Sequence, residues 1–309
     1  MSATLPLLMI SAMYENGGNT THRLLDGHPE LFVYPFESQI GTALVNDALS
    51  AMFPAKYRWP AFALDGSPAA DYHAIIDEEA RVRARTPHVS KFRHVPFDFS
   101  DDERREHYVR YVTRSGRSTP DNVGAFFKAT FDAWKNHRRS GRERIYVGYA
   151  PVIIVDAALI LSQMPNAHVL HVVRNPWSAY ADTRKRPVPL PLAGYMLRWS
   201  LNQHFALLCK QLFPDRIHIV RIEDVMTSPR DALSGVCNAL GIAYDPSLDA
   251  PSWNGDKLEE VYPWGTIRRA TAEANRATAA ELSADEQRAV RLHGGLFLKP
   301  FGYDDFLRP

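Results

Sequence analysis

Cysteine is scarce in this sequence, and so is any excess of charge. The 309 residues include two cysteines, Cys209 and Cys237, which form no CxxC pair and have no histidine at a zinc-binding spacing. This argues against a disulfide scaffold or a zinc finger and suits a reducing compartment, so we expect buried thiols and a cytoplasmic location. The formal net charge of +1 supplies no overall field for nucleic acid or an anionic membrane, so nucleic acid is not an expected partner.

A long apolar segment is also missing. A helix needs roughly 20 apolar residues to span a bilayer, and no run in the sequence approaches that length. The apolar stretch 5–12 has no basic segment before it and leads into a glycine turn rather than a cleavage site. We therefore interpret it as a buried strand and not as a signal peptide, and we expect no stable membrane insertion.

Short runs rich in Val, Ile and Leu alternate with helical patterns along the chain. The expected strands are residues 5–12, 31–34, 145–149, 168–173 and 216–221. The expected helices are residues 20–27, 152–163, 191–212, 229–240 and 285–296. This alternation is typical of an α/β fold with a parallel sheet flanked by helices. We expect a single domain over residues 1–309.

Two of these helices carry clear end signals. Ser228 and Pro229 supply an N-cap and a first-turn proline, and Gly241 follows the end of the same helix. Ser283 and Glu286 have the spacing of a capping box. The boundaries of these two helices are therefore well marked.

The segment 46–144 interrupts the alternation, because it is rich in aromatic residues, His and Arg and has weak periodicity. We interpret it as an insertion of helices and loops between the second and third strands. Ligands of open parallel sheets bind outside the carboxyl ends of the strands, so we expect the insertion to form a lid or a wall of the acceptor site. Its aromatic residues are candidates for an acceptor cleft or for core: Tyr57, Trp59, Phe62, Phe92, Phe97, Phe99, Phe126, Phe127 and Trp134.

A glycine-rich turn follows the first strand and opens the first helix. Its residues are Asn16, Gly17, Gly18, Asn19 and Thr20. Backbone N–H groups at a helix N-terminus favour an anion, which predicts a P-loop-like phosphate site; a tight turn that binds nothing is the alternative. No lysine follows the glycines, so the turn is not the GxxxxGK[ST] loop of a kinase or ATPase.

Four segments in this order make the chain resemble the sulfotransferase family, whose members transfer a sulfuryl group from 3′-phosphoadenosine-5′-phosphosulfate (PAPS) to a hydroxyl or amine. Residues 10–31, with Leu-Leu-Asp-Gly-His-Pro, align with the family's 5′-phosphosulfate loop and helix. Residues 172–176 look like its 3′-phosphate motif. Residues 221–225 are similar to its last strand and loop, and 263–269 fall where a basic donor-covering loop is expected.

The resemblance implies a sulfotransferase fold, PAPS as donor substrate and a small molecule or glycan as acceptor. It places Arg174 at the donor's 3′-phosphate. The other implied donor-binding residues are Asn16, Gly17, Gly18, Asn19, Thr20, Asp182, Arg268 and Arg269. Glu37 lies close to the family's general base, which takes the proton of the acceptor hydroxyl; a structural acid is the alternative. Glu15 completes the predicted catalytic residues.

The sequence departs from the family pattern where the chemistry is expected. Glu15 stands where the family has a lysine or arginine, and Asp182 stands where a serine usually follows the arginine. The lysine that often follows the third strand is missing from residues 148–151. Two unit charges 4 Å apart interact by about 4 kcal/mol at an effective dielectric constant near 20, so exchanging a cation for an anion weakens phosphate binding substantially.

Replacement cations are present nearby. The candidates are His22, Arg23, Lys128, the run Arg184, Lys185 and Arg186, and the pair Arg268 and Arg269. The run is the best compensator, because clustered guanidinium groups bind phosphate well. Two alternatives to PAPS-dependent sulfuryl transfer stay open: a transferase with another phosphorylated donor, reached through a metal ion, and a non-catalytic binding protein that has lost its donor site.

Overall fold

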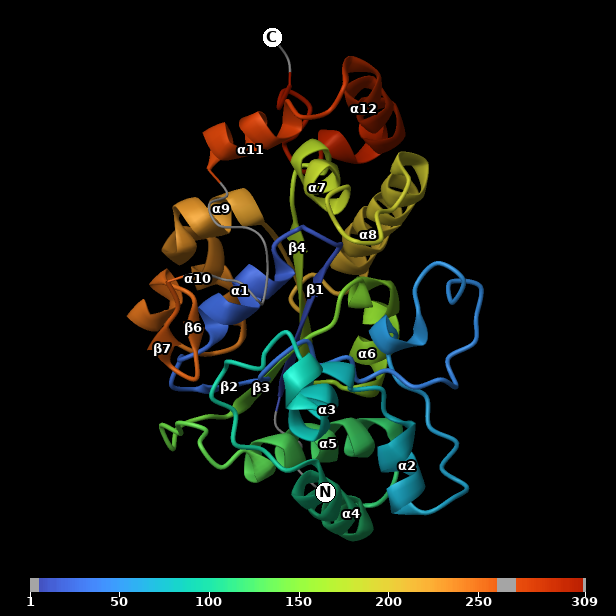
Figure 1. Ribbon diagram of the computed structural model, residues 1–309, viewed down its shortest axis with the longest axis vertical. Coiled ribbons are helices and arrows are strands. Elements are labelled where there is room, and N and C mark those ends of the chain that lie inside the picture. Colours follow the sequence, from blue (N-terminus) through green and yellow to red (C-terminus); the bar gives the residue numbers. More distant parts are fainter. Residues whose placement is uncertain (1–5, 260–270, 308–309) are drawn as a thin grey trace.

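A parallel sheet of five strands forms the centre of the fold (Figure 1), in a computed structural model that describes residues 6–259 and 271–307. From edge to edge the strands are β2 (Leu31–Val33), β3 (Ile145–Tyr149), β1 (Leu7–Ala12), β4 (Ala167–Val173) and β5 (Ile217–Arg221). Every neighbouring pair is parallel. The predicted α/β class and the five predicted strands are confirmed, although Leu5 lies outside the described residues.

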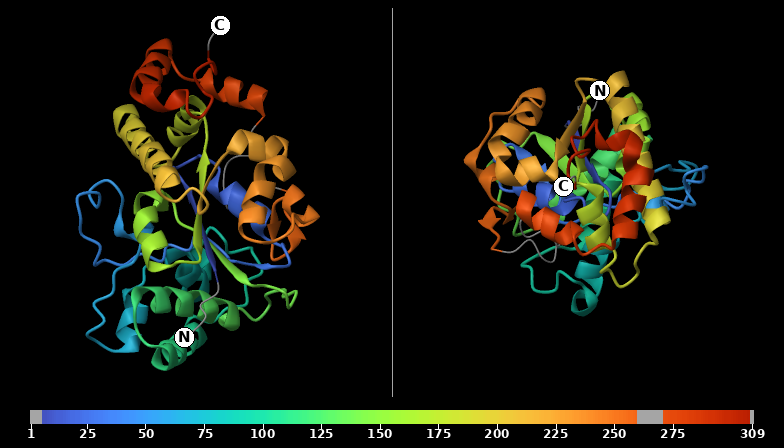
Figure 2. Two further views of the ribbon diagram at one scale, coloured as in Figure 1. Left: turned by 180° about the vertical axis from the view of Figure 1, so that it is seen from behind. Right: turned by 90° about the horizontal axis from the view of Figure 1, so that it is seen from above.

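Helices cover both faces of the sheet, as the view from above shows (Figure 2). Alternate side chains of a strand point to opposite faces, so Leu8 and Ile10 enter one core while Leu7 and Met9 enter the other. The first core is completed by α1 (Gly18–Leu25), α9 (Ile222–Thr227) and α10 (Pro229–Ala239). The second is completed by η3 (Ile153–Asp156), α6 (Ala157–Gln163), α8 (Leu192–Leu212) and parts of the insertion.

The chain leaves the sheet in opposite directions after β1 and after β4. β1 leads into α1 on the first face, whereas β4 leads through α7 (Pro176–Thr183) into α8 on the second face. Adjacent strands whose connections diverge form a topological switch point, where open parallel sheets bind their ligands at the carboxyl edge. The fold therefore places a ligand between the ends of β1 and β4.

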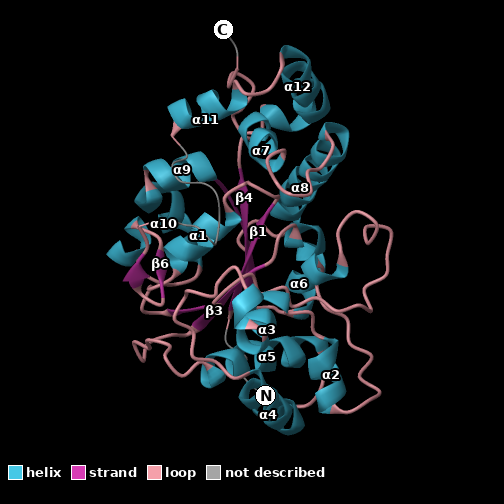
Figure 3. Ribbon diagram, viewed as in Figure 1, coloured by secondary structure: helices cyan, strands magenta, loops and turns pink. Residues whose placement is uncertain are grey.

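The insertion consists of helices joined by loops, as predicted (Figure 3). Its elements are η1 (Ala55–Tyr57), α2 (Pro68–Ala74), α3 (Glu78–Arg85), η2 (Pro87–Val89), α4 (Asp101–Ser115) and α5 (Thr119–Ala133). α5 contributes Phe126, Phe127 and Phe131 to the second core, where Phe127 and Phe131 pack with Tyr146 of β3. The insertion is therefore anchored on the sheet rather than detached from it.

Buried charges also hold the insertion in place. Arg104 of α4 is fully buried, and its guanidinium contacts the Asp77 carboxylate at 2.6 Å and the Asp101 carboxylate at 2.5 Å. The same guanidinium donates to the hydroxyls of Tyr72 at 2.8 Å and Tyr34 at 3.1 Å. Because Tyr34 follows β2 directly, this network fixes the insertion to the carboxyl edge of the sheet.

Smaller elements complete the carboxyl-terminal part of the chain. They are η4 (Pro246–Asp249), the hairpin of β6 (Ser252–Trp253) and β7 (Asp256–Lys257), α11 (Ala272–Ala279) and α12 (Ala284–Leu298). α11 packs on α7, and α12 packs on α8. The predicted capping box of Ser283 and Glu286 is confirmed. Ser228 precedes α10, but its side chain makes no capping hydrogen bond.

Other sequence expectations were tested by the same structure. Cys209 and Cys237 are free and buried, as predicted. No helix within the described ranges combines the length and apolar composition needed to cross a membrane. Those ranges also contain no group of three or more His, Cys, Asp or Glu side chains that could hold a metal ion.

Candidate functional site

The turn between β1 and α1 has the backbone shape of an anion site. Gly17 has a φ of 89°, and a Cβ there would lie 2.4 Å from the side chain of Ile222, so only glycine fits. The Thr21 N–H donates to the Gly17 carbonyl at 2.9 Å. The N–H groups of residues 18–20, in the first turn of α1, have no acceptor within the helix by helix geometry, and they favour an anion in front of α1.

Tyr149, at the end of β3, fills the space beside this helix N-terminus. A Cβ on Gly18 would lie 2.6 Å from the Tyr149 hydroxyl oxygen, so the hydroxyl and the first residue of α1 are in close contact. Burial, followed by the charge of Glu37, raises the pKa of Tyr149 well above its ordinary value. Tyr149 therefore stays protonated and offers a neutral hydrogen-bond donor in the segment where the lysine is missing.

Arg174 joins the end of β4 to the turn after β1. Its backbone N–H donates to the Asn16 side-chain oxygen at 2.9 Å, and its guanidinium donates to the Glu15 carbonyl at 3.1 Å. The guanidinium also bonds the Asn275 side chain at 3.0 Å and the Asp182 carboxylate at 2.8 Å. The structure thus brings Asn16 and Arg174, two of the predicted donor-binding residues, together at the switch point.

The Asp182 carboxylate bonds the Arg174 guanidinium, which is the group predicted to bind the 3′-phosphate of the donor. Its carboxylate is shared between Arg174 and Lys185, at 2.8 Å and 3.3 Å. A donor phosphate that used Arg174 would have to displace this carboxylate or lie beside it. The other predicted cations of the donor site, Arg268 and Arg269, lie outside the described residues.

Glu37 lies beyond the end of β2, close to the first turn of α1. One of its carboxylate oxygens accepts from the Asn19 side chain at 3.2 Å, and the other accepts from the Gln39 side chain at 3.1 Å. Thr20, the next residue of α1, is buried. Glu37 is half-buried, and its carboxylate contacts two neutral amides and, among the described residues, no arginine.

Two charged residues of the insertion reach this glutamate and were not predicted. The Glu79 carboxylate accepts the Glu37 backbone N–H at 3.2 Å and contacts the Lys91 ammonium at 2.5 Å. Burial, and then the charge of Glu37, raises the pKa of Glu79 to about 7. No sequence signal distinguishes Glu79 from the neighbouring Glu78, which faces solvent.

Arg186, one of the predicted replacement cations, lies beside the loop. Its guanidinium is 4.8 Å from the ring centroid of Tyr14, in the β1–α1 turn. Among the described residues it has no carboxylate partner, whereas Arg184 pairs with Glu286 and Lys185 pairs with Asp182 and Glu281.

The remaining candidate cations are committed elsewhere. Arg23 is fully buried and donates to the Tyr34 carbonyl at 2.9 Å, beside His22. Lys128 pairs with Asp132 at 2.7 Å, one turn further along the same helix. Within the described part of the chain, the sequence hypothesis of a basic compensator therefore narrows to Arg186.

Most of the predicted aromatic residues are core and not cleft. The buried ones are Trp59, Phe92, Phe97, Phe126, Phe127 and Trp134. Phe62 and Phe99 are half-buried against the same core. Tyr57 differs, because its ring packs edge-on against the ring of Tyr14, with 6.1 Å between the ring centroids. Burial and then the charge of Glu37 raise the pKa of Tyr57, and the charge of Arg186 opposes this shift. Tyr57 is thus the predicted aromatic residue that reaches the site.

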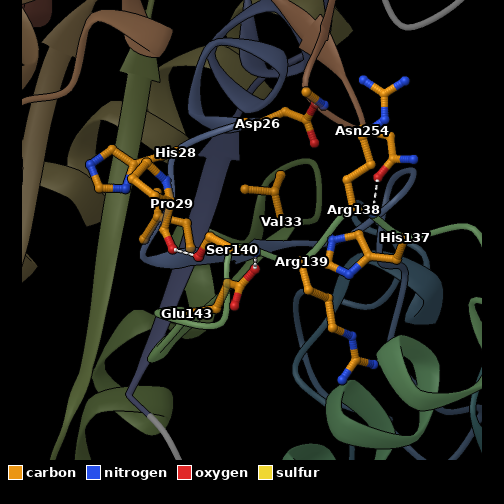
Figure 4. Close-up of a pocket in the computed structure, with 13 residues that line it drawn as sticks. Asp26, His28, Pro29, Val33, His137, Arg138, Arg139, Ser140, Glu143 and Asn254 are labelled. Atoms are coloured by element: carbon orange, nitrogen blue, oxygen red, sulfur yellow. Dashed lines mark hydrogen bonds between the residues drawn. The ribbon is translucent and has the colours of Figure 1, made fainter.

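A separate pocket of about 220 Å³ lies near the segments that precede β2 and β3 (Figure 4). Figure 4 shows Ser140 bonded to Pro29 and to Glu143 at its rim. Two arginines line the pocket, but Arg138 pairs with Asp256 and Arg139 pairs with Asp132. It faces away from the strand ends that carry Glu37 and Arg174, and we assign it no part in the site.

Fold and site together define an α/β protein with a glycine-rich loop between the first strand and the first helix, at the switch point of a parallel sheet. The sequence matches the profile of the family described as "Sulfotransferase family" over residues 8–246, which is more than half of the chain. The chain therefore belongs to the sulfotransferase family, and it is a transferase. No curated protein matches its sequence.

A solved structure with a TM-score above 0.5 agrees with this assignment at the level of the fold. The sulfotransferase domain of the Synechococcus olefin synthase is 15% identical and covers 98% of both chains with a TM-score of 0.51. A sulfotransferase of Mycobacterium avium is 12% identical and covers 97% of this chain and 78% of its own, with a TM-score of 0.46. One from Alicyclobacillus acidocaldarius is 14% identical and covers 92% and 95%, with a TM-score of 0.42.

Proposed function

We propose that this protein transfers the sulfuryl group of PAPS to a hydroxyl or amine of a small molecule or glycan, with Glu37 as the general base. The observation that carries the proposal is the meeting of three parts at one edge of the sheet. These parts are the N-terminus of α1, Arg174 at the end of β4, and the Glu37 carboxylate bonded to Asn19 of α1.

The chemistry follows from these positions. Glu37 takes the proton of the acceptor, the acceptor oxygen or nitrogen attacks sulfur, and the bond between sulfur and the 5′-phosphate oxygen breaks. The negative charge that develops on that oxygen faces the N–H groups of the α1 N-terminus and the Tyr149 hydroxyl. The insertion, with Tyr57 at its inner side, forms the acceptor wall.

Arg186 supplies the positive charge that Glu15 does not. We expect Arg186→Met to weaken binding of the product 3′-phosphoadenosine-5′-phosphate by about 10- to 100-fold, because a hydrogen bond to a charged group contributes about 1.5–3 kcal/mol. Isothermal titration calorimetry measures the change. Arg184→Met is the matched control, since Arg184 is paired with Glu286, and its affinity should stay within about twofold. Equal affinity of wild type and Arg186→Met would remove Arg186 from the donor site.

Asp182 competes with the donor for Arg174. We therefore expect Asp182→Ser, which restores the family's usual residue, to strengthen binding of 3′-phosphoadenosine-5′-phosphate by at least about tenfold, because a carboxylate and a phosphate about 4 Å apart repel each other by roughly 4 kcal/mol at an effective dielectric constant near 20. The same titration measures it, with Asp102→Ser as control, because Asp102 is an exposed residue of α4. Weaker binding in Asp182→Ser would mean that the carboxylate contributes to the donor site.

A second candidate donor is favoured by the same ion pair. A carboxylate on Arg174 suits a phosphorylated donor that lacks the 3′-phosphate, or one that reaches the acids through a divalent cation. A thermal-shift panel of PAPS, its product, ATP, GDP-sugars and S-adenosylmethionine, each with and without magnesium, separates the candidates because a bound donor stabilises the fold by mass action. Metal-independent stabilisation by PAPS supports the first proposal, and stabilisation only by another nucleotide with magnesium supports the second.

A further inference from the structure

The insertion and the proposed base meet at two neighbouring carboxyl groups. Glu79 begins the contact from α3, where one of its oxygens accepts the backbone N–H of Glu37 at 3.2 Å. Its other oxygen contacts the ammonium of Lys91 at 2.5 Å, and Lys91 lies in the chain just after η2. The side chain of Glu79 is 13% exposed. Glu79 therefore links the insertion to Glu37 directly and is itself largely removed from water.

The two carboxyl groups are not separated by a bridging arginine. The Glu37 oxygens are held by the neutral amides of Asn19 and Gln39, so its charge is not cancelled by these contacts. Like charges at one site disfavour double ionisation, and the two groups then take up and release protons as a pair. Among residues 6–259 and 271–307, the cation in direct contact with the pair is Lys91, which bonds Glu79.

The other groups that face this pair do not neutralise it. Burial raises the pKa values of Tyr57 and Tyr149, which are packed on the pair from η1 and β3 and stay neutral. Burial lowers the pKa of Lys91, but the charges of Glu79 and then Glu37 raise it by more. The pKa of Lys91 is therefore above its ordinary value, and Lys91 stays charged. More distant charges that act on these neighbours are Arg186 and Glu15. The electrostatic balance thus depends mainly on Glu37, Glu79 and Lys91.

We propose that Glu79 is a positioning residue, which fixes the backbone of Glu37 and takes the proton that the two neighbouring carboxyl groups share, with Lys91 controlling how tightly that proton is held. Glu37 is thereby held in place to accept the proton of the acceptor. The catalytic half of this inference rests on the proposed role of Glu37, whereas the shared proton does not. Burial and the Glu37 charge, which raise the pKa of Glu79 to about 7, support the assignment.

The decisive experiment follows the glutamate carboxyl carbons by NMR in protein labelled with ¹³C at that position. Wild type should show one carboxyl that titrates near pH 7. That titration should vanish in Glu79→Gln, fall by about one pH unit or more in Glu37→Gln, and rise in Lys91→Met, since strongly coupled groups shift each other by at least that much. Glu78→Gln, which changes the exposed neighbour, should leave it unchanged. A wild-type spectrum without such a titration, or one unaltered in Glu37→Gln, would overturn the inference.

Turnover distinguishes this inference from the proposed function. We expect Glu79→Ala, which removes the acceptor of the Glu37 backbone N–H, to lower kcat by about 10- to 100-fold with the KM for the donor unchanged, because a misplaced base loses its alignment with the acceptor. Glu79→Gln keeps an acceptor oxygen and should retain more of the turnover, but the dependence of kcat on pH around pH 7 that we expect of wild type should disappear in it. If Glu37→Gln retains full turnover while the NMR coupling is present, the proposed base is wrong and the proton pair stands. If Glu37→Gln is inactive and Glu79→Ala behaves as wild type, the positioning role is wrong.

Discussion

Glu37→Gln is expected to lower kcat by about 10²- to 10⁴-fold while affinity for 3′-phosphoadenosine-5′-phosphate is unchanged. A positioned general base contributes about this much to a rate, and glutamine keeps the size and the hydrogen-bonding capacity of the side chain but cannot accept the proton. Glu37 contacts the α1 turn through the Asn19 side chain rather than through the backbone N–H groups that face the anion. The donor site should therefore survive the substitution.

Sulfuryl transfer from radiolabelled PAPS to a panel of hydroxyl and amine acceptors measures the first quantity, and calorimetry measures the second. Glu78→Gln is the control, because Glu78 is an exposed residue of α3 whose partner is Lys56. A loss of donor binding in Glu37→Gln would indicate a structural acid rather than a base. Unchanged turnover with intact donor binding would place the base elsewhere.

Arg104→Met is expected to lower the free energy of unfolding by about 3–5 kcal/mol. Removing one member of a buried ion-pair network leaves the remaining charges without compensation. In this protein the uncompensated groups would be Asp77, fully buried, and Asp101, of which 4% is exposed. Tyr34 and Tyr72 would lose a hydrogen-bond donor as well.

Chemical denaturation followed by circular dichroism measures the effect. Arg105→Met is the matched control on the same helix, because Arg105 is 38% exposed and its partner Asp102 is 75% exposed. Exposed pairs contribute about 0–1 kcal/mol, so Arg105→Met should lower the free energy of unfolding by no more than about 1 kcal/mol. Equal stability of the two variants would show that the buried network does not hold the insertion on the sheet.

The sheet could be predicted from the sequence because its strands are apolar on both faces. Residues 7–12 are buried at every position, and such runs bounded by turn residues are a strong local signal. The individual helices of the insertion were harder to predict from the sequence, and α4 illustrates the reason. Its buried side includes Asp101 and Arg104 as well as Tyr108 and Val112, so the apolar periodicity that identifies a helix is weakened by the charges that the helix buries.

The site was predictable where it follows the order of the chain and not where distant segments meet. The loop residues, Glu37 and Arg174 each follow a predicted strand, and the parallel order brings strand ends to one edge. Glu79 is 42 residues away from Glu37 in sequence, and its contact depends on how the insertion folds back. The basic run 184–186 was visible, but only the structure shows that Arg186 is the member over the loop.

We expect the loop before α1, together with Arg174 and Arg186, to hold a PAPS-type donor without a metal ion. Calorimetric titration of the wild-type protein with 3′-phosphoadenosine-5′-phosphate, in buffer that contains a chelator of divalent cations, tests it most directly. We expect saturable binding of one molecule of 3′-phosphoadenosine-5′-phosphate per chain, and weaker binding in Arg186→Met. No heat at millimolar ligand, or binding that appears only when magnesium is added, would contradict it.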